Sequence, residues 1–126
     1  MGARLQYAKV IDRELFYSRG GRIHPGLVNE VALKDGQAVA GAFLVLRAWT
    51  DDHGSFTEQW KIEGPGGALI YSSVPREMHL ATPAHIEKLE DEIADLEIGD
   101  PGAAYQAVFL LDDEEAARTR FSIRAS

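Results

Sequence analysis

Cysteine is absent from this chain of 126 residues. Disulfides, thiolate metal sites and cysteine nucleophiles are therefore excluded. Long apolar runs are missing too, since no stretch approaches the roughly 20 apolar residues that a membrane helix needs. Residues 1–7 lack the apolar core of a signal peptide. We therefore expect a cytoplasmic protein that does not associate with a membrane.

Positive charge is scarce relative to negative charge. The sequence has 13 lysines and arginines against 20 aspartates and glutamates, which gives a formal net charge of −7. A field of this sign repels phosphate and anionic lipid, so we expect no binding to nucleic acid. Apolar residues make up 45% of the chain and charged residues 26%, as in ordinary globular proteins. With no linker-like segment, residues 1–126 are expected to form a single domain.

The usual catalytic motifs are missing as well. No serine lies in a Gly-x-Ser-x-Gly elbow, and the glycine-rich segments 19–22 and 64–67 lack the lysine and the context of a phosphate loop. The histidines stand singly, without the paired spacing of zinc ligands, at His24, His53, His79 and His85. We therefore expect no enzymatic activity and no cofactor.

Alternation of apolar and polar residues predicts strands along much of the chain. In segment 56–63 one face carries Phe56, Trp60 and Ile62 with a single charged residue, Glu58. The turn 64–67 contains proline and glycine, and residues 68–71 return, so this region is predicted to be a hairpin. Segments 105–111 and 117–124 alternate in the same way around the acidic turn 112–114.

Residues 40–49 are almost continuously apolar, which predicts a central strand covered on both sides. We expect residues 42, 44, 46 and 48 to face the core, and loop 50–55 to close a hairpin with segment 56–63. The opposite row would be an exposed interface, formed by Phe43, Val45, Arg47 and Trp49. A second copy of the chain is the preferred cover for this row, and segment 86–96 is the alternative. Trp60 is expected to lie in the core.

The last strand is predicted to carry a basic stripe on its outward face, formed by Arg118, Arg120 and Arg124. Such a stripe either discourages edge-to-edge aggregation, which is the preferred reading, or docks an acidic partner. In the first third of the chain, segments 7–11, 14–17 and 27–33 are expected to be short strands.

Two alternatives stay open for residues 83–94. One is a short helix capped by Thr82, with Pro83 in its first turn and apolar residues at 86, 89, 93 and 96. The other is an edge strand that ends at residues 96–98.

Short strands joined by glycine and proline turns predict an all-β fold, a two-sheet antiparallel sandwich with at most one short helix. Leu96-Glu97-Ile98 followed by Pro101-Gly102-Ala103-Ala104-Tyr105 resembles the corner before strand F in immunoglobulin-like and fibronectin type III domains. This resemblance implies that Tyr105 is buried and that its hydroxyl bonds to nearby backbone. The whole chain is similar to short uncharacterised bacterial and phage proteins of this sandwich type.

Sandwich domains commonly use loops and sheet faces for protein contact. We therefore expect a binding or assembly module with a protein partner or a second copy. The alternative is a small-ligand or calcium-binding domain, because calcium favours carboxylates that loops bring together. Its candidate ligands are Asp51, Asp52, Asp112 and Asp113. Aspartate is also common in turns for conformational reasons, and we expect no metal.

Overall fold

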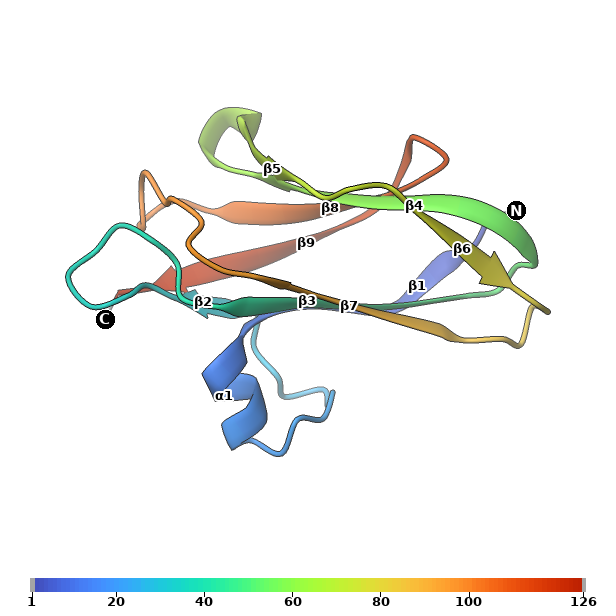
Figure 1. Ribbon diagram of the computed structural model, residues 1–126, viewed down its shortest axis with the longest axis horizontal. Helices are drawn as coiled ribbons and strands as arrows, with labels where there is room; N and C mark the ends of the chain where they lie inside the picture. Colours follow the sequence, from blue (N-terminus) through green and yellow to red (C-terminus); the bar gives the residue numbers. More distant parts are fainter. Residues whose placement is uncertain (1, 126) are drawn as a thin grey trace.

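The computed structural model describes residues 2–125 as two β-sheet layers with one short helix on the outside (Figure 1). The upper layer contains β4 (Gly54–Glu63), β5 (Leu69–Ser72), β6 (Arg76–Leu80), β8 (Tyr105–Leu111) and β9 (Glu114–Arg124). The lower layer contains β1 (Arg4–Asp12), β2 (Glu30–Ala32), β3 (Phe43–Thr50) and β7 (Glu87–Ile93). The helix is α1 (Arg13–Ser18), and a 3-10 turn, η1 (Pro65–Gly67), connects β4 to β5. The prediction of an all-β sandwich is confirmed.

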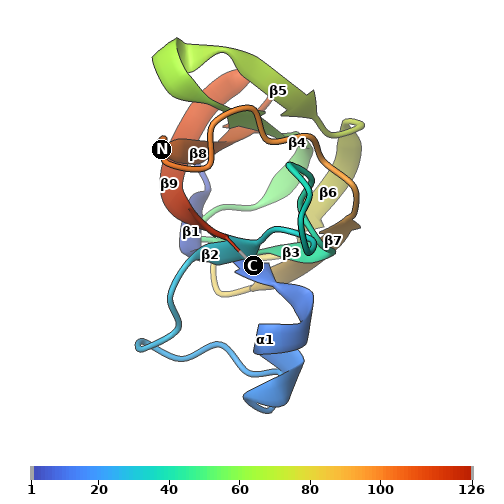
Figure 2. The same cartoon turned by 90° about the vertical axis from the view of Figure 1, so that its left-hand side faces the viewer.

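The two layers join along one side and part along the other (Figure 2). β9 pairs with β8 in the upper layer and, at residues 122–124, with β2 in the lower layer. β2 runs parallel to both of its neighbours, β9 and β1. On the other side the strand order ends at β7, while β6 pairs with β4. The pairings of residues 2–125 include none between β6 and β7, so the sandwich is open there.

The link between β3 and β4 differs from the hairpin predicted for it. β3 pairs with β1 and β7, whereas β4 pairs with β5, β6 and β8. The loop between them therefore crosses from one layer to the other. Each strand carries a row of large inward side chains, and the two rows fill the core only when they meet face to face. The predicted hairpins β4–β5 and β8–β9 are confirmed.

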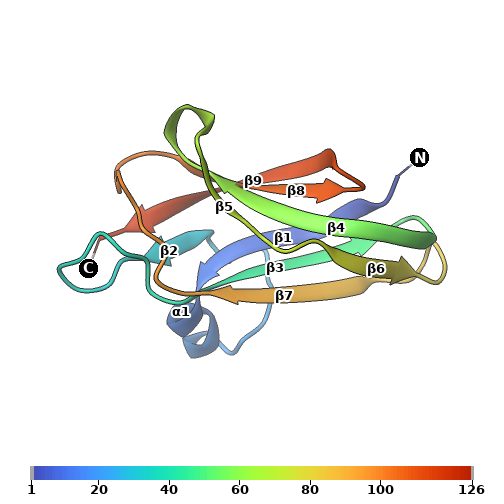
Figure 3. The ribbon, with the colours of Figure 1, turned by 45° about the horizontal axis from the view of Figure 1, so that its top comes forward.

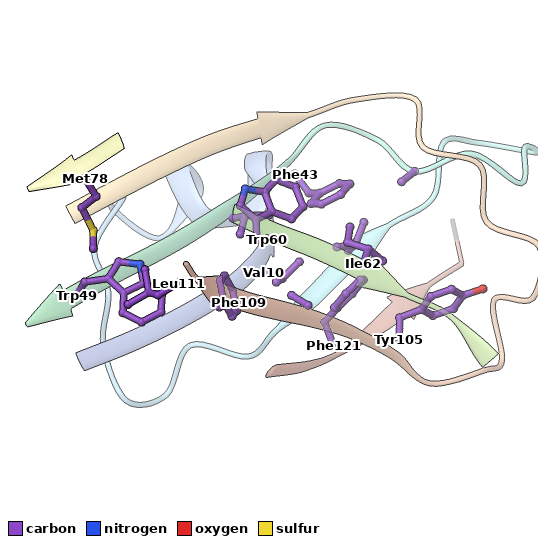
Figure 4. Close-up of a cluster of buried hydrophobic side chains, with 14 of the residues drawn as sticks. Val10, Phe43, Trp49, Trp60, Ile62, Met78, Tyr105, Phe109, Leu111 and Phe121 are labelled. Carbon is purple, nitrogen blue, oxygen red and sulfur yellow. The ribbon is translucent and has the colours of Figure 1, made fainter. Parts of the chain in front are cut away.

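The core lies between the layers and consists of these inward rows (Figure 4). Trp60 is fully buried, as predicted, and so are Ile62, Phe109 and Tyr105 from neighbouring strands. The Tyr105 hydroxyl donates to the Asp100 carbonyl at 2.8 Å and accepts from the Asp100 N–H at 3.2 Å. The predicted tyrosine corner is therefore present.

Residues 14–17 form a helix, so the strand predicted for them is wrong. The Asp12 carboxylate accepts a hydrogen bond from the Leu15 N–H at 3.0 Å and caps the first turn. The helix stops at Gly20 and Gly21, which adopt positive φ angles of 90° and 66°. At six residues the helix is too short to display the apolar periodicity by which helices are recognised in a sequence.

For residues 83–94 the structure selects the edge strand over the helix, with β7 paired to β3, but the strand ends at Ile93 and not at residues 96–98. Thr82 begins a turn, in which its carbonyl accepts from the His85 N–H at 3.0 Å. In β7 the residues Leu89, Asp91 and Ile93 are partly buried, whereas the alternate residues are exposed. An aspartate in the inward row conceals this period-2 pattern in the sequence.

Candidate functional site

The predicted exposed row on β3 lies in the core. Phe43, Val45, Arg47 and Trp49 each have no exposed surface in the single chain, and Figure 4 shows Phe43 and Trp49 among the core side chains. The expectation that they form an interface is wrong. Both faces of a strand with this composition must be covered, and here one chain covers both.

The opposite face of β3, expected to meet the main core, packs under α1 instead. Leu44 and Leu46 form a second buried cluster with Ile11, Phe16 and Leu27. Helix α1 and the loop after it therefore stand on the outer face of the lower layer (Figure 1). The cover comes from residues 13–27, and segment 86–96 contains β7, which lies in the same sheet as β3.

Arg47 and Glu58 form a buried ion pair across the core. Their side chains are 0% and 1% exposed. The Arg47 Nε donates to Glu58 Oε2 at 2.6 Å, and Nη2 donates to Oε1 at 2.7 Å. The Trp49 indole N–H also donates to Glu58, at 3.1 Å. Glu58, the charged residue in the inward row of β4, is thus paired with Arg47, the charged residue in the inward row of β3.

Asp91 extends this pair to the open side of the sandwich. Its carboxylate accepts from the Trp60 indole at 2.6 Å, lies 2.9 Å from Arg47 Nη1, and accepts from Arg76 of β6 at 2.5 Å. Burial raises the pKa of Asp91, but the Trp60 hydrogen bond and the charges of Arg47 and Arg76 outweigh it. The pKa therefore lies below its ordinary value, and Asp91 is ionised at neutral pH.

This network holds strands of the two layers together. Within residues 2–125, no buried side-chain nitrogen or oxygen lacks a hydrogen-bond partner. Arg47, Glu58 and Asp91 come from β3, β4 and β7, so their contacts tie the two layers to each other. A catalytic group must reach a substrate, and Arg47 and Glu58 are closed off from solvent.

A groove with a volume of about 660 Å³ runs beside α1 on the outer face of the lower layer. We call it the α1 groove. It is lined by Tyr7, Phe16, Tyr17, Arg22, Leu46, Lys88 and Glu90. Its floor belongs to β1, β3 and β7, and its wall belongs to α1 and the loop that follows. Its size is within the range of about 300–1,000 Å³ that is common for ligand sites.

Contacts of α1 with its surroundings set the wall of the α1 groove. The Tyr17 ring meets the Phe16 ring edge-on at a centroid separation of 5.3 Å. The Arg13 guanidinium lies 5.4 Å from the Tyr17 ring centroid, and its Nε donates to Glu92 of β7 at 3.0 Å. At Gly21 a Cβ atom would lie 3.3 Å from Tyr17, so this glycine permits a close approach. Tyr17 is held in place, yet it is 50% exposed.

Tyr7 forms part of the floor. Burial, and next the negative charge of Glu90, raise the pKa of its hydroxyl above the ordinary value. Tyr7 is therefore neutral at physiological pH and presents a ring with a hydrogen-bonding hydroxyl.

Sequence reasoning missed this site because its residues come from four separate segments. The Asp12 cap and the two glycines after residue 19 were the signals that could have located α1.

The predicted outward stripe on β9 is exposed, and its arginines pair with carboxylates at two of three positions. Arg118 pairs with Glu115 at 2.7 Å and with Glu63 at 2.9 Å, and Arg124 pairs with Glu30 at 3.0 Å. β9 pairs with β8 at residues 114–121 and with β2 at residues 122–124. These ladders pair no residue of the stripe on both sides, so the role of guarding an edge stays a prediction. A role in docking a partner stays a prediction.

The acidic loops adopt the backbone of turns. Asp51, Asp112 and Asp113 have φ angles of 69°, 50° and 66°, a left-handed conformation that aspartate tolerates better than most residues. Asp51 pairs with Arg4, and an Asp112 carboxylate oxygen accepts from the Thr57 N–H at 2.9 Å. Within the described range, no three histidines, aspartates or glutamates are grouped to hold a metal ion.

The histidines do not gather at one site. His79 lies 3.4 Å from the Ser55 hydroxyl, and His85 bonds to Glu87 at 2.9 Å.

Among the residues described, no helix is long and apolar enough to cross a membrane.

Comparisons with known proteins identify the fold. No protein-family model and no curated protein sequence matches this chain. Among solved structures, it is similar to the alkylpurine DNA glycosylase AlkC of Pseudomonas fluorescens, bound to DNA with an abasic-site analogue, at 10% identity and a TM-score of 0.59. That match covers 98% of this chain but 30% of the glycosylase, so the chain spans less than a third of that protein.

An immunoglobulin-like protein of Pseudomonas aeruginosa is similar over its full length. The match covers 98% of both chains at 15% identity, with a TM-score of 0.51. At sequence identities this low, structural similarity establishes the fold alone. This similarity, together with the two layers, the tyrosine corner and the strand pairing, shows that the protein has an immunoglobulin-like β-sandwich fold.

Proposed function

We propose that this protein is a non-enzymatic binding module that takes a segment of a partner protein into the α1 groove. The observation that carries this proposal is the incomplete cover of the outer sheet face. Helix α1 buries Leu44 and Leu46, but beside it the rings of Tyr7 and Tyr17 and the cations Arg22 and Lys88 line a groove. Tyrosine and arginine are enriched among the residues that dominate binding energy at protein interfaces.

The chemistry of the α1 groove favours binding over catalysis. Its described lining contains no serine or histidine, and its one carboxylate, Glu90, has no nucleophilic hydroxyl or thiol beside it other than the tyrosine hydroxyls. The raised pKa of Tyr7 keeps its hydroxyl protonated, so it is a poor base. Aromatic rings with a few polar groups are instead typical of a recognition surface.

The comparisons support the module role in general terms. One similar structure is a free-standing immunoglobulin-like protein, and the other is a glycosylase of which the matching part is 30%. The fold therefore occurs both alone and within a longer chain. Because that glycosylase is bound to DNA, DNA belongs among the probes for this protein.

Selection from a displayed library of random peptides tests the proposal. We expect peptides enriched on the wild-type protein to lose binding to the variant Tyr17→Ala. Leu69→Ala is the matched control, because Leu69 is a similarly exposed residue at 60%, against 50% for Tyr17, and it lies on β5 in the other layer. The control should bind the selected peptides as the wild type does.

A second variant separates loss of the groove from loss of the fold. Lys88→Glu changes the floor from β7 without removing a contact of α1, and thermal unfolding checks that both variants are folded. Failure to enrich any peptide, or equal binding to wild type and both groove variants, would overturn the proposal. So would a dimer of the wild type in sedimentation that Tyr17→Ala dissociates, because a second copy of the chain would then occupy the α1 groove.

A further inference from the structure

The loop at the end of α1 carries two arginines without carboxylate partners. Arg19 and Arg22 flank Gly20 and Gly21, whose positive φ angles of 90° and 66° end the helix. Both arginine side chains are exposed. Within residues 2–125, neither forms an ion pair.

This contrasts with the other arginines of the surface. Most of them pair with an aspartate or glutamate, as Arg4, Arg13, Arg76, Arg118 and Arg124 do. The chain has 20 acidic residues for 13 basic ones, so carboxylates are not in short supply. In the described chain, Arg120 is the only other arginine without such a pair, and it lies on β9.

The unpaired charge lies at the α1 groove. Arg22 lines its wall, Lys88 lines its floor, and Glu90 is the carboxylate that lines it. Arg19 adds a further cation at the end of the helix. The groove is therefore locally basic on a molecule whose formal net charge is −7. Guanidinium groups bind carboxylates through paired N–H donors.

We propose that the α1 groove binds an acidic peptide segment with one aromatic or aliphatic anchor. The anchor rests against the rings of Tyr7 and Tyr17, and flanking aspartates or glutamates meet Arg19 and Arg22. This inference rests on the proposed function, and it names the chemistry of the partner. Glu90 lies at the floor, beside Tyr7, where the anchor and not a carboxylate would sit.

A short acidic peptide fits these charges better than a nucleic acid. Duplex DNA carries one negative charge per about 1.7 Å of its axis and would extend beyond the groove. There it would meet exposed acids such as Glu14 of α1 and the negative field of the whole molecule. A segment with a few carboxylates needs only the local cations.

Fluorescence anisotropy with defined probes tests this inference. The first probe is a labelled peptide with a central phenylalanine flanked by glutamates. The second has glutamines in place of the glutamates, the third has alanine in place of phenylalanine, and the fourth is a single-stranded DNA oligonucleotide. We expect the first probe to bind most tightly and to weaken with added salt, because exposed charges are screened.

Charge reversal locates the site. Arg22→Glu should weaken binding of the first probe by about tenfold or more, which is about 1.4 kcal/mol. Arg120→Glu is the matched control, since it makes the same change at an exposed, unpaired arginine elsewhere, and it should leave the affinity unchanged. Lys88→Glu should act in the same direction as Arg22→Glu.

Four outcomes would overturn the acidic partner. They are equal binding of the glutamine peptide, an equal effect of Arg120→Glu, no effect of Arg22→Glu, and tighter, Arg22-dependent binding of DNA. Groove-dependent binding of the glutamine peptide would refute the acidic preference and leave the proposed function intact. If neither these peptides nor the selected library peptides bind, both proposals fail.

Discussion

Arg47 and Glu58 are charged residues in rows that otherwise carry apolar side chains. Moving each ion out of water costs several kcal/mol, and only close pairing with further hydrogen bonds offsets that cost. Here the pair is bidentate, and Trp49 supplies another donor to Glu58. The geometry therefore compensates the buried charges, but it makes each residue depend on the other.

Removing one partner should be much more harmful than removing both. We predict that Glu58→Gln destabilises the protein by about 3 kcal/mol, the lower end of the cost of breaking a buried ion pair, because Arg47 loses its bidentate counterion and keeps only the Asp91 carboxylate at 2.9 Å. Urea denaturation followed by tryptophan fluorescence measures this change. The double variant Arg47→Met/Glu58→Leu should be more stable than Glu58→Gln, because it leaves no unpaired charge in the core, although the Trp49 indole N–H loses its acceptor and Asp91 loses one of its cations. Loss of less than about 1 kcal/mol in Glu58→Gln would mean that water reaches the guanidinium.

Tyr105 anchors the corner before β8 through a single hydroxyl. The side chain is 1% exposed, and the hydroxyl bonds to both the carbonyl and the N–H of Asp100. We predict that Tyr105→Phe costs about 1–3 kcal/mol, because two backbone groups lose their partner. Tyr71→Phe is the control, since the Tyr71 ring stacks on Trp60 while its hydroxyl has no protein partner in the described chain. Equal unfolding midpoints for the two variants would contradict the prediction.

At the scale of elements, β3 is a strand with two buried faces and two different covers. Val45 belongs to the main core, whereas Leu44 and Leu46 pack with Phe16 of α1. Figure 3 shows α1 on the outer side of the layer that contains β3. We predict that Val45→Glu unfolds the protein instead of dissociating a dimer, because it buries a charge with no counterion. Circular dichroism and sedimentation distinguish the two results. Arg120→Glu, an exposed change to the same residue, should stay folded, and a folded, soluble Val45→Glu would refute the packing.

Sequence periodicity predicted most strands because exposure alternates along them. Segment 56–63 and the last strand matched the structure face by face, since one side of each is wet. On β3 the same reasoning failed. When both faces of a strand are apolar, the sequence does not indicate which face packs in the main core and which packs under α1. The two rows were therefore assigned to the wrong partners.

A charged residue in an inward row explains why residues 83–94 stayed open between helix and strand. Asp91 interrupts the inward row of β7, and Leu89 and Ile93 share the 3-4-3 spacing of a helix with Ile86 and Leu96, which lie outside the strand. The binding surface was beyond sequence reasoning, because the α1 groove depends on a helix that is six residues long. A single sequence does not show that Tyr7, Tyr17 and Lys88 meet.

At the scale of the molecule, the two sides of the sandwich are closed by different means. One side is continuous in backbone hydrogen bonds through β9 and β2. On the other side, side chains do this work, as Asp91 of β7 meets Arg76 of β6, Arg47 of β3 and Trp60 of β4. On this side, ion pairs and side-chain hydrogen bonds connect the two layers in place of backbone hydrogen bonds. We therefore expect the free energy of unfolding to depend on pH through the ionisation of Asp91.

The sign of that response follows from the lowered pKa of Asp91. A group whose pKa is lower in the folded state stabilises the fold above its unfolded pKa, which is about 3.9 for aspartate, and loses this effect as the pH falls through the folded value. We predict that Asp91→Asn costs about 1–3 kcal/mol at neutral pH, and that the gap to the wild type narrows below about pH 4. Thermal unfolding of both proteins across this range measures the gap.

The control for this experiment is Asp113→Asn, at an exposed turn residue with a φ of 66° that asparagine also tolerates. Other carboxylates titrate in the same range, but they do so in the wild type and in each variant, so the difference isolates the substituted position. Asp113→Asn should show no gap that changes with pH. A gap for Asp91→Asn that stays constant from neutral pH to pH 3 would mean that the carboxylate closes the sandwich through its shape, with no contribution from its charge.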